Sequence, residues 1–159
     1  MQKNHFETLH VFRNGEDKNL ITYIILVQKF TKELVVAFFG TQNTFQLIEQ
    51  IMSADLKSYS LHPEVSNAMV VNYYDKYYRE YFRKDFENNL KKYMEEYPNY
   101  KIIFTGHSLG GAMSMQAATD AVLSKWIDPK KTAIYTFGQP RVGNYIFAQI
   151  LEKRYIISI

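Results

Sequence analysis

The stretch IFTGHSLGGAM, Ile103 to Met113, decides the fold class because it joins an apolar run to a helix-forming run through a serine flanked by glycines. Gly106, Ser108 and Gly110 fit the pattern G-x-S-x-G, in which the serine lies on a sharp turn from strand to helix. So tight a turn favours residues without a Cβ atom beside the serine, and Gly111 lets the helix start close to the sheet. The pattern predicts that Ser108 is a nucleophile.

The same turn predicts where an oxyanion would bind. The first N–H groups of a helix are unpaired, and they lie at the positive end of the helix dipole. The N–H of Leu109 is therefore the expected donor to an oxyanion formed when Ser108 attacks a substrate. The alternative is a glycine-rich turn in which Ser108 only caps the helix. The strand-like KIIF before the motif and the helix-forming AMSMQAATDAVL after it favour the nucleophile.

Outward from this stretch, apolar strand-like runs alternate with helical ones. The alternation predicts the α/β class, with a mostly parallel sheet and flanking helices. Strand runs that are apolar on nearly every residue predict a sheet covered on both faces. No linker or repeat divides the chain, so we expect an irregular segment over 1–19 and one domain over 20–159. Strands are expected at 20–28, 33–40, 100–106, 131–138 and 155–159, and helices at 75–97, 108–126 and 144–154.

The expected helix at 75–97 is rich in aromatic residues. Its apolar residues recur at steps of three and four, which predicts one buried stripe with charged residues solvated around it. Pro98 ends the helix. The alternative for the segment NYYDKYYREYFRKDF is a base-stacking or membrane-interface surface, because aromatic residues interleaved with Lys and Arg also occur there. The stripe residues are Tyr78, Phe82, Phe86, Leu90, Tyr93 and Tyr97.

Composition excludes several classes of protein. With 47% hydrophobic and 22% charged residues, the chain is typical of an ordinary globular protein, and its net charge of +3 gives no argument for nucleic acid. It contains no cysteine, and its longest apolar run, LITYIILV, is too short to span a bilayer. There is no signal peptide in these residues, and compartment stays open. No cluster of ligands has metal spacing and no glycine loop binds phosphate, so neither metal nor cofactor is implied.

Three segments in order carry a resemblance to a known family. VVAFFGTQNTFQLI, YPNYKIIFTGHSLGGAM and KTAIYTFGQPRVGNYIFA are similar to segments of the class 3 (fungal-type) lipases, an α/β-hydrolase family, and look closest to its nematode-like branch. The resemblance covers the chain from about residue 20 onward. It implies a serine ester hydrolase that acts on acylglycerols or related lipid esters, with transient contact to a lipid interface. Related lipases are often secreted, which leaves the compartment of this chain unknown.

The resemblance also implies roles for particular residues. The family's second oxyanion donor corresponds to Thr41, which without the resemblance would be a turn residue after a strand. Phe39 stands where the family usually has arginine, and PEVSNAM stands where many members carry V-H-x-G-F. Pro140 and Arg141 match a family loop and are interpreted as structural, a rigid turn with an anchoring guanidinium.

An acid and a base for Ser108 are harder to assign. In α/β-hydrolases they follow the serine in the order Asp, His, yet no histidine follows Ser108. The resemblance places the acid just past the strand at 155–159, so we interpret the chain as a domain cut before its acid and base. The acids after Ser108, none at the expected strand-end position, are Asp120, Asp128 and Glu152; the histidines are His5, His10 and His62, and His107, expected to help hold the turn.

Three hypotheses follow. The first is a lipase-like hydrolase domain with nucleophile and oxyanion donors that lacks its acid and base and is very weak alone. The second is a non-catalytic lipid-binding or interaction protein that keeps the hydrolase scaffold. The third is an active hydrolase in which His5, His10 or His62 is recruited as the base. The substrate lipid, a lid and the oligomeric state are not fixed by the sequence.

Overall fold

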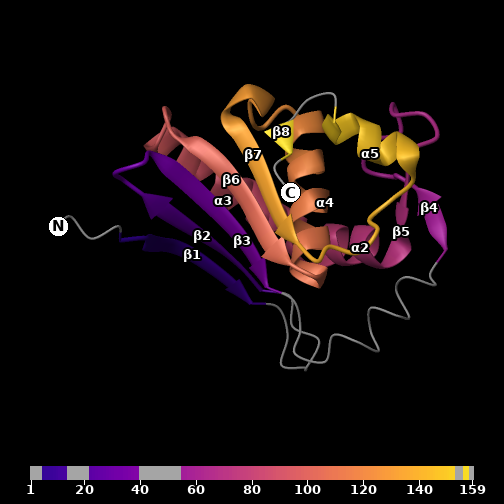
Figure 1. The fold of residues 1–159 in the computed structure, drawn as a ribbon, viewed down its shortest axis with the longest axis horizontal. Helices are drawn as coiled ribbons and strands as arrows, with labels where there is room; N and C mark the ends of the chain where they lie inside the picture. The colour runs from indigo at the N-terminus through magenta and orange to yellow at the C-terminus, as the bar shows by residue number, and fades with distance from the viewer. Residues whose placement is uncertain (1–4, 14–21, 40–54, 153–155, 158–159) are drawn as a thin grey trace.

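A computed structural model describes residues 5–13, 22–39, 55–152 and 156–157 of the chain. Their main feature is a six-stranded sheet in the order β1-β2-β3-β6-β7-β8 (Figure 1). The first three strands are antiparallel neighbours, and β3, β6, β7 and β8 run parallel. A small second sheet pairs β4 with β5. The strands are β1 (Glu7–Arg13), β2 (Thr22–Gln28), β3 (Glu33–Phe39), β4 (Leu56–Ser58), β5 (Met69–Val71), β6 (Lys101–His107), β7 (Thr132–Phe137) and β8 (Ile156–Ile157).

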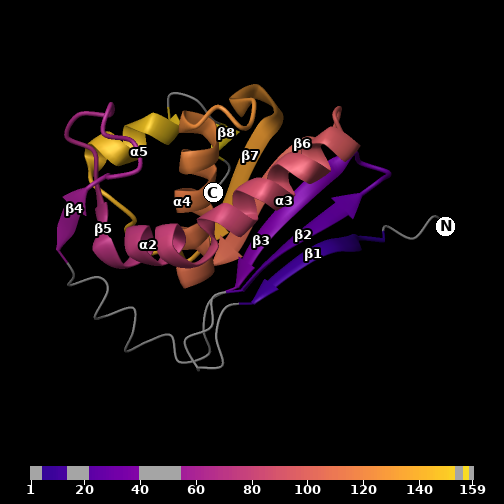
Figure 2. The same ribbon diagram turned by 180° about the vertical axis from the view of Figure 1, so that it is seen from behind.

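The helices connect the parallel strands. The strands β3, β6, β7 and β8 follow one another in the same direction across the sheet, so right-handed crossovers place their helices on the same face. Viewed from behind, α3 lies over the sheet, with α4 and α2 beside it (Figure 2). The helices are α2 (Asn72–Tyr77), a π-helical turn η1 (Tyr78–Phe82), α3 (Arg83–Glu96), α4 (Leu109–Leu123), a 3₁₀ turn η2 (Pro129–Lys131) and α5 (Tyr145–Glu152). The predicted α/β class is confirmed.

The core lies between this helical layer and the sheet. Every second residue of the inner strands is buried toward the helices, because side chains alternate between the faces of a strand. Tyr23 on β2 and Phe38 on β3 meet Phe82 and Phe86, with ring centroids 5.6 to 6.2 Å apart. Aromatic side chains therefore make the main contact between the sheet and the helix that precedes β6.

The expectation of a sheet covered on both faces is wrong for the described residues. The face opposite α3 and α4 carries apolar side chains that are only partly buried: Ile24, Leu26, Val35, Ala37 and Ile103. An apolar run shows that a strand avoids water, but the direction of the crossovers decides which face the helices cover. Here every described crossover helix takes the same face.

The expected long helix is divided by the π turn η1. Its stripe is buried as predicted, since Tyr78, Phe82, Phe86 and Leu90 are each 1% exposed or less. Steps of four residues advance by about 40° per step around an α-helix, so the stripe would wind away from the sheet. A wider π turn absorbs part of that drift. The helix ends at Glu96, two residues before Pro98, as expected.

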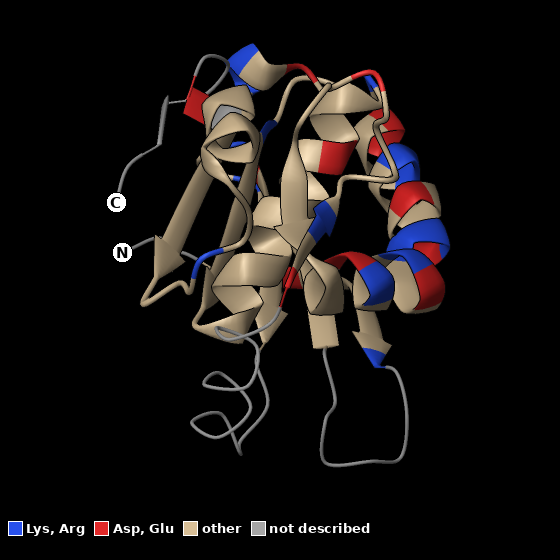
Figure 3. Ribbon diagram, turned by 90° about the vertical axis from the view of Figure 1, so that its right-hand side faces the viewer, with Lys and Arg blue, Asp and Glu red and all other residues tan. Residues whose placement is uncertain are grey.

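The aromatic segment also carries a second row of rings. Tyr73 and Tyr77 are half-buried and Tyr81 is 48% exposed. Charged residues of both signs follow one another along the outer side of α3 (Figure 3). One of them, Asp85, differs from the expected solvated face, because it accepts hydrogen bonds from Tyr23 and His10.

The N-terminal segment contains a strand where an irregular chain was expected. β1 pairs antiparallel with β2 at the edge of the sheet. Two contacts distant in sequence hold it: the Tyr93 hydroxyl donates to the Leu9 carbonyl at 2.6 Å, and His10 Nε2 lies 2.9 Å from Asp85 Oδ1. A half-exposed edge strand held by such contacts leaves little periodic signal in its own residues.

Candidate functional site

Ser108 lies on a strained turn between β6 and α4. Its backbone adopts φ +52° and ψ −120°, a region that costs a non-glycine residue about 1–3 kcal/mol. The Ser108 N–H donates to the Phe137 carbonyl at 2.8 Å, which ties the turn to β7. The residue is 7% exposed. Neighbouring strand and helix thus fix the position of the serine at the carboxyl edge of the parallel strands.

The glycines of the motif are required by close backbone approach. A Cβ atom at Gly106 would lie 2.4 Å from the carbonyl carbon of Gly110, a contact that real side chains do not make. A Cβ atom at Gly111 would lie 3.3 Å from the Cβ atoms of Thr136 and Gln139. The strand before Ser108 and the helix after it therefore cross at a distance that only glycine permits at Gly106.

Backbone donors lie directly after the serine. The first hydrogen bond of α4 runs from the Ala112 N–H to the Ser108 carbonyl at 3.1 Å, so the N–H groups of Leu109, Gly110 and Gly111 have no partner inside the helix. Leu109 buries its side chain completely. Its N–H lies in the unpaired first turn of α4, and its role as an oxyanion donor stays a prediction. Thr41, the second expected donor, lies outside the described residues.

The buried histidine of the chain is not close to Ser108. His62 donates through Nε2 to Asp120 Oδ1 at 2.8 Å and through Nδ1 to Glu64 Oε1 at 2.9 Å. Asp120 lies twelve residues after Ser108 on α4, a separation of about 18 Å at 1.5 Å per residue. The His62–Asp120 pair is hydrogen-bonded like the His and Asp of a catalytic triad, but it lies near the C-terminal end of α4, far from Ser108.

Asp120 is the centre of a buried network. Its side chain is fully buried and accepts hydrogen bonds from His62, from Tyr78 at 2.7 Å and from Arg83 Nε at 2.8 Å. Burial alone would raise the pKa of Asp120, but these donors outweigh it and lower that pKa. For His62, burial alone would lower the pKa, but the hydrogen bonds to Asp120 and Glu64 outweigh burial and raise that pKa. The network therefore stabilises an ion pair.

The remaining histidines are also accounted for. His10 lies on β1, three strands from β6 and thus about 14 Å away across the sheet, and contacts Asp85. His107 precedes Ser108 and is exposed, and a Cβ atom at Gly138 would lie 3.4 Å from its Nε2. His5 is exposed near the chain start. Within the described residues, no side chain hydrogen-bonds to the Ser108 hydroxyl.

The loop after β7 is anchored as expected for a structural element. Arg141 Nε donates to the Gly143 carbonyl at 2.9 Å. The Asn144 N–H donates to the Met69 carbonyl at 2.9 Å, which fastens the loop to β5. Gly143 is required there, because a Cβ atom would lie 2.4 Å from the Met69 carbonyl oxygen.

An aromatic rim that was not predicted from the sequence lies beside Ser108. Phe39 and Phe137 end the strands β3 and β7 on either side of β6, and they are 49% and 59% exposed. Phe137 pairs in register with His107. The available signal in the sequence was a phenylalanine followed by glycine at the end of each of two expected strands. Their exposure gives the carboxyl edge an apolar surface.

No helix among the described residues is long and apolar enough to cross a membrane. Within those same ranges, no three His, Cys, Asp or Glu residues gather as a metal-ligand cluster.

Comparison with known proteins agrees with this geometry. A lipase of Caenorhabditis elegans is 29% identical over 81% of this chain and 35% of its own, and a Rhizopus niveus lipase is 47% identical over 36% of this chain and 15% of its own. The crystal structure of a Rhizopus microsporus var. chinensis lipase superposes with a TM-score of 0.82 at 32% identity, covering 95% of this chain and 50% of that chain. The present chain thus spans half or less of the length of these relatives. Residues 35–159 match the family model described as Lipase (class 3), and the chain belongs to that family.

Proposed function

We propose that this chain carries the nucleophile and oxyanion side of a serine hydrolase of lipid esters. Ser108 attacks the acyl carbonyl, and the Leu109 N–H, with Thr41 as the expected second donor, stabilises the oxyanion. The observation that carries the proposal is the backbone of Ser108, a non-glycine residue held at positive φ where strand and helix meet. A capping serine needs no such strain, because helix caps adopt extended backbone.

The substrate class in this proposal is acylglycerols or related lipid esters. It rests on family membership and on the aromatic rim, since Phe39 and Phe137 place apolar surface next to the serine. Exposed apolar side chains around a reactive group suit a substrate that is presented at a lipid surface. A transient contact of this edge with lipid belongs to the same proposal.

Turnover by the 159-residue chain is expected to be low. A serine without a positioned base loses most of its catalytic rate, and losses of about 10⁴ to 10⁶ follow removal of triad members in other serine hydrolases. His62 and His10 are held by carboxylates away from Ser108. Recruitment of either histidine as the base would require breaking those contacts first.

A second candidate function is lipid binding without catalysis, with the turn kept as scaffold. The engagement of His62 by Asp120 and Glu64 favours it, because this buried imidazole is occupied structurally. The two candidates differ in whether Ser108 reacts. Both predict contact with lipid at the same edge.

Labelling with a fluorophosphonate separates them. The reagent is incubated with the chain, with Ser108→Ala and with Ser114→Ala, a buried serine that only bonds the Thr105 carbonyl. We expect an adduct at Ser108 in the first and third proteins, located by mass spectrometry, and none in the second. An adduct on another serine, or the same zero signal in all three proteins after long incubation, would contradict the hydrolase proposal.

A further inference from the structure

A hollow lies beside the elbow, the strand-to-helix turn over Gly106–Gly111, and is bounded by the β4–β5 sheet and the start of the helical layer. It has a volume of about 500 Å³, within the range of small-molecule pockets, and α2 and the π turn form its floor. α2 packs against α4, and Figures 1 and 2 both show it beside the end of α4 that starts at the elbow. The hollow is therefore separate from Ser108 but on the same side of the molecule.

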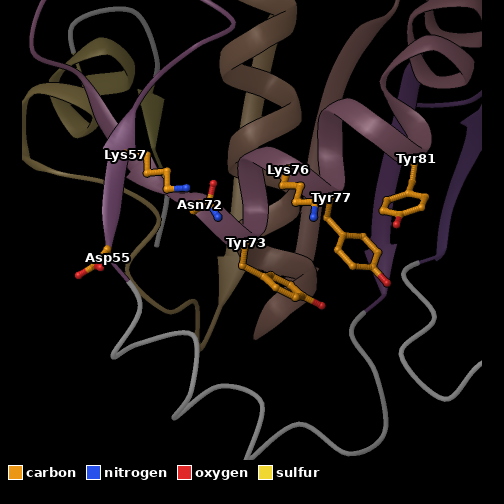
Figure 4. Close-up of a pocket in the computed structure, with 7 residues that line it drawn as sticks. All are labelled: Asp55, Lys57, Asn72, Tyr73, Lys76, Tyr77 and Tyr81. Atoms are coloured by element: carbon orange, nitrogen blue, oxygen red, sulfur yellow. The ribbon is translucent and has the colours of Figure 1, made fainter.

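Three tyrosines form a row along this hollow. Tyr73, Tyr77 and Tyr81 recur every four residues, and their neighbouring ring centroids are 5.1 and 4.8 Å apart. The residues that alternate with them, such as Tyr74 and Tyr78, are fully buried in the core. In Figure 4 the three rings project on the same side of the helix. Tyr73 and Tyr77 pack against the core on one side and remain half-buried, and Tyr81 is 48% exposed, so the row presents amphipathic surface to a ligand or an interface.

Two lysines supply charge at the same place. Lys57 on β4 and Lys76 on α2 line the hollow, and neither forms an ion pair with another described residue. Figure 4 shows the Lys57 amine directed toward Asn72, whereas the carboxylate of Asp55, the lining acid, points away from them. The hollow thus combines two cations and an amide with a row of phenol rings, which suits an anion attached to a larger polyol or acyl group.

We propose that this hollow binds a phosphate-bearing head group, with the phosphate between Lys57 and Lys76 and the rest of the molecule along the tyrosine row. This deepens the proposed function and rests on it, because it makes phospholipids, rather than neutral acylglycerols alone, a substrate class for Ser108. The same chemistry would also hold a free phosphate ester. The lipid is the source we favour, because tyrosine rings with one polar end suit the boundary between head groups and acyl chains.

Binding is measured separately from hydrolysis. The full chain is mixed with vesicles of phosphatidylcholine, with vesicles of phosphatidylcholine and phosphatidic acid in a three-to-one ratio, and with glycerol 3-phosphate in solution. The test variant is Lys57→Gln/Lys76→Gln. The control is Lys84→Gln/Lys130→Gln, which removes the same charge from exposed lysines outside the hollow. Co-sedimentation measures vesicle binding and calorimetry measures binding of glycerol 3-phosphate.

The proposal predicts tighter binding to the phosphatidic acid vesicles, and roughly 30-fold weaker binding for the test variant than for the control, since each lysine contributes about fivefold at an anionic surface. Lysine-dependent binding of glycerol 3-phosphate without vesicle binding would support the phosphate site and assign it to a free ester. Equal losses in both variants, or no phosphate-dependent binding, would overturn the proposal. Ser108 labelling is unaffected by these results, so failure of this site and failure of the hydrolase proposal are distinguishable.

Discussion

The two ends of α4 carry Ser108 and Asp120, and the two residues differ in backbone strain and in hydrogen bonding. At the N-terminal end, Ser108 is strained and has no side-chain partner among the described residues. At the C-terminal end, Asp120 is unstrained, fully buried and bonded to several donors. Residue types that can act in catalysis thus lie at both ends of α4, and we propose that only the strained end reacts. The C-terminal end, where the carboxylate of Asp120 accepts several hydrogen bonds, stabilises the fold.

The largest effect on stability is expected from adding a side chain at Gly106 in the elbow. Gly106→Ala places a Cβ atom 2.4 Å from the Gly110 backbone. Neither of these two backbone segments can move without displacing β6 from α4. We expect loss of more than about 4 kcal/mol of stability, seen as insoluble protein or loss of cooperative thermal unfolding. The matched control is Gly138→Asn, since asparagine tolerates the φ of +55° at that position. Similar melting of both variants would show that the elbow is not sterically closed.

The next largest effect is expected at the other end of the helix. Asp120→Asn removes the charge that His62 and Arg83 share, and breaking a buried pair in this way costs about 3–5 kcal/mol. Chemical denaturation measures the loss. Asp128→Asn is the control, because within the described part of the chain that exposed carboxylate accepts a hydrogen bond from the Lys130 N–H alone, and its loss should cost less than about 1 kcal/mol. Equal effects of the two variants would contradict the structural role of Asp120.

A smaller effect is expected in the pH dependence of stability. Because the folded protein raises the pKa of His62 above 6.5, its stabilisation is complete below pH 6.5 and is lost as pH rises through the folded pKa. The lowered pKa of Asp120 keeps its own contribution present above pH 3.8, so it does not change in this window. The melting temperature should fall as pH rises from 6.5 to 8, and His62→Gln should make the melting temperature depend less on pH in this range. An unchanged pH dependence in the variant would exclude His62 as its source.

The smallest effect is expected between the two ends. Gln116 lies four residues before Asp120 and is fully buried, and neither of its amide atoms has a hydrogen-bond partner among the residues that the structure describes. Burying an unpartnered amide is unfavourable, so Gln116→Met, which keeps the volume, should raise the free energy of unfolding by about 1 kcal/mol. Gln149→Met on α5 is the comparison, since that exposed amide bonds the Tyr145 hydroxyl. Destabilisation by Gln116→Met would indicate that an ordered water satisfies the amide.

The same contrast explains what the sequence could predict. The elbow depends on residues within five positions of one another, so Gly106, Ser108 and the helix after them were predictable from local pattern. His62 and Asp120 are 58 residues apart, and only the folded chain brings them together. The strand β1 and the row of Tyr73, Tyr77 and Tyr81 likewise depend on long-range contacts. The sequence indicated many aromatic residues there, but not which of them face the core.

Ser108 is proposed as the reactive group, and the His62–Asp120 pair is proposed to take no part in its chemistry. The direct test is the rate at which a fluorophosphonate labels Ser108 in the chain and in His62→Gln, measured at a temperature where both are folded. The account predicts rates that agree within about twofold, since a base absent from the site contributes nothing. A fall of about 100-fold or more in the His62→Gln variant, the size expected for loss of a general base, would contradict it.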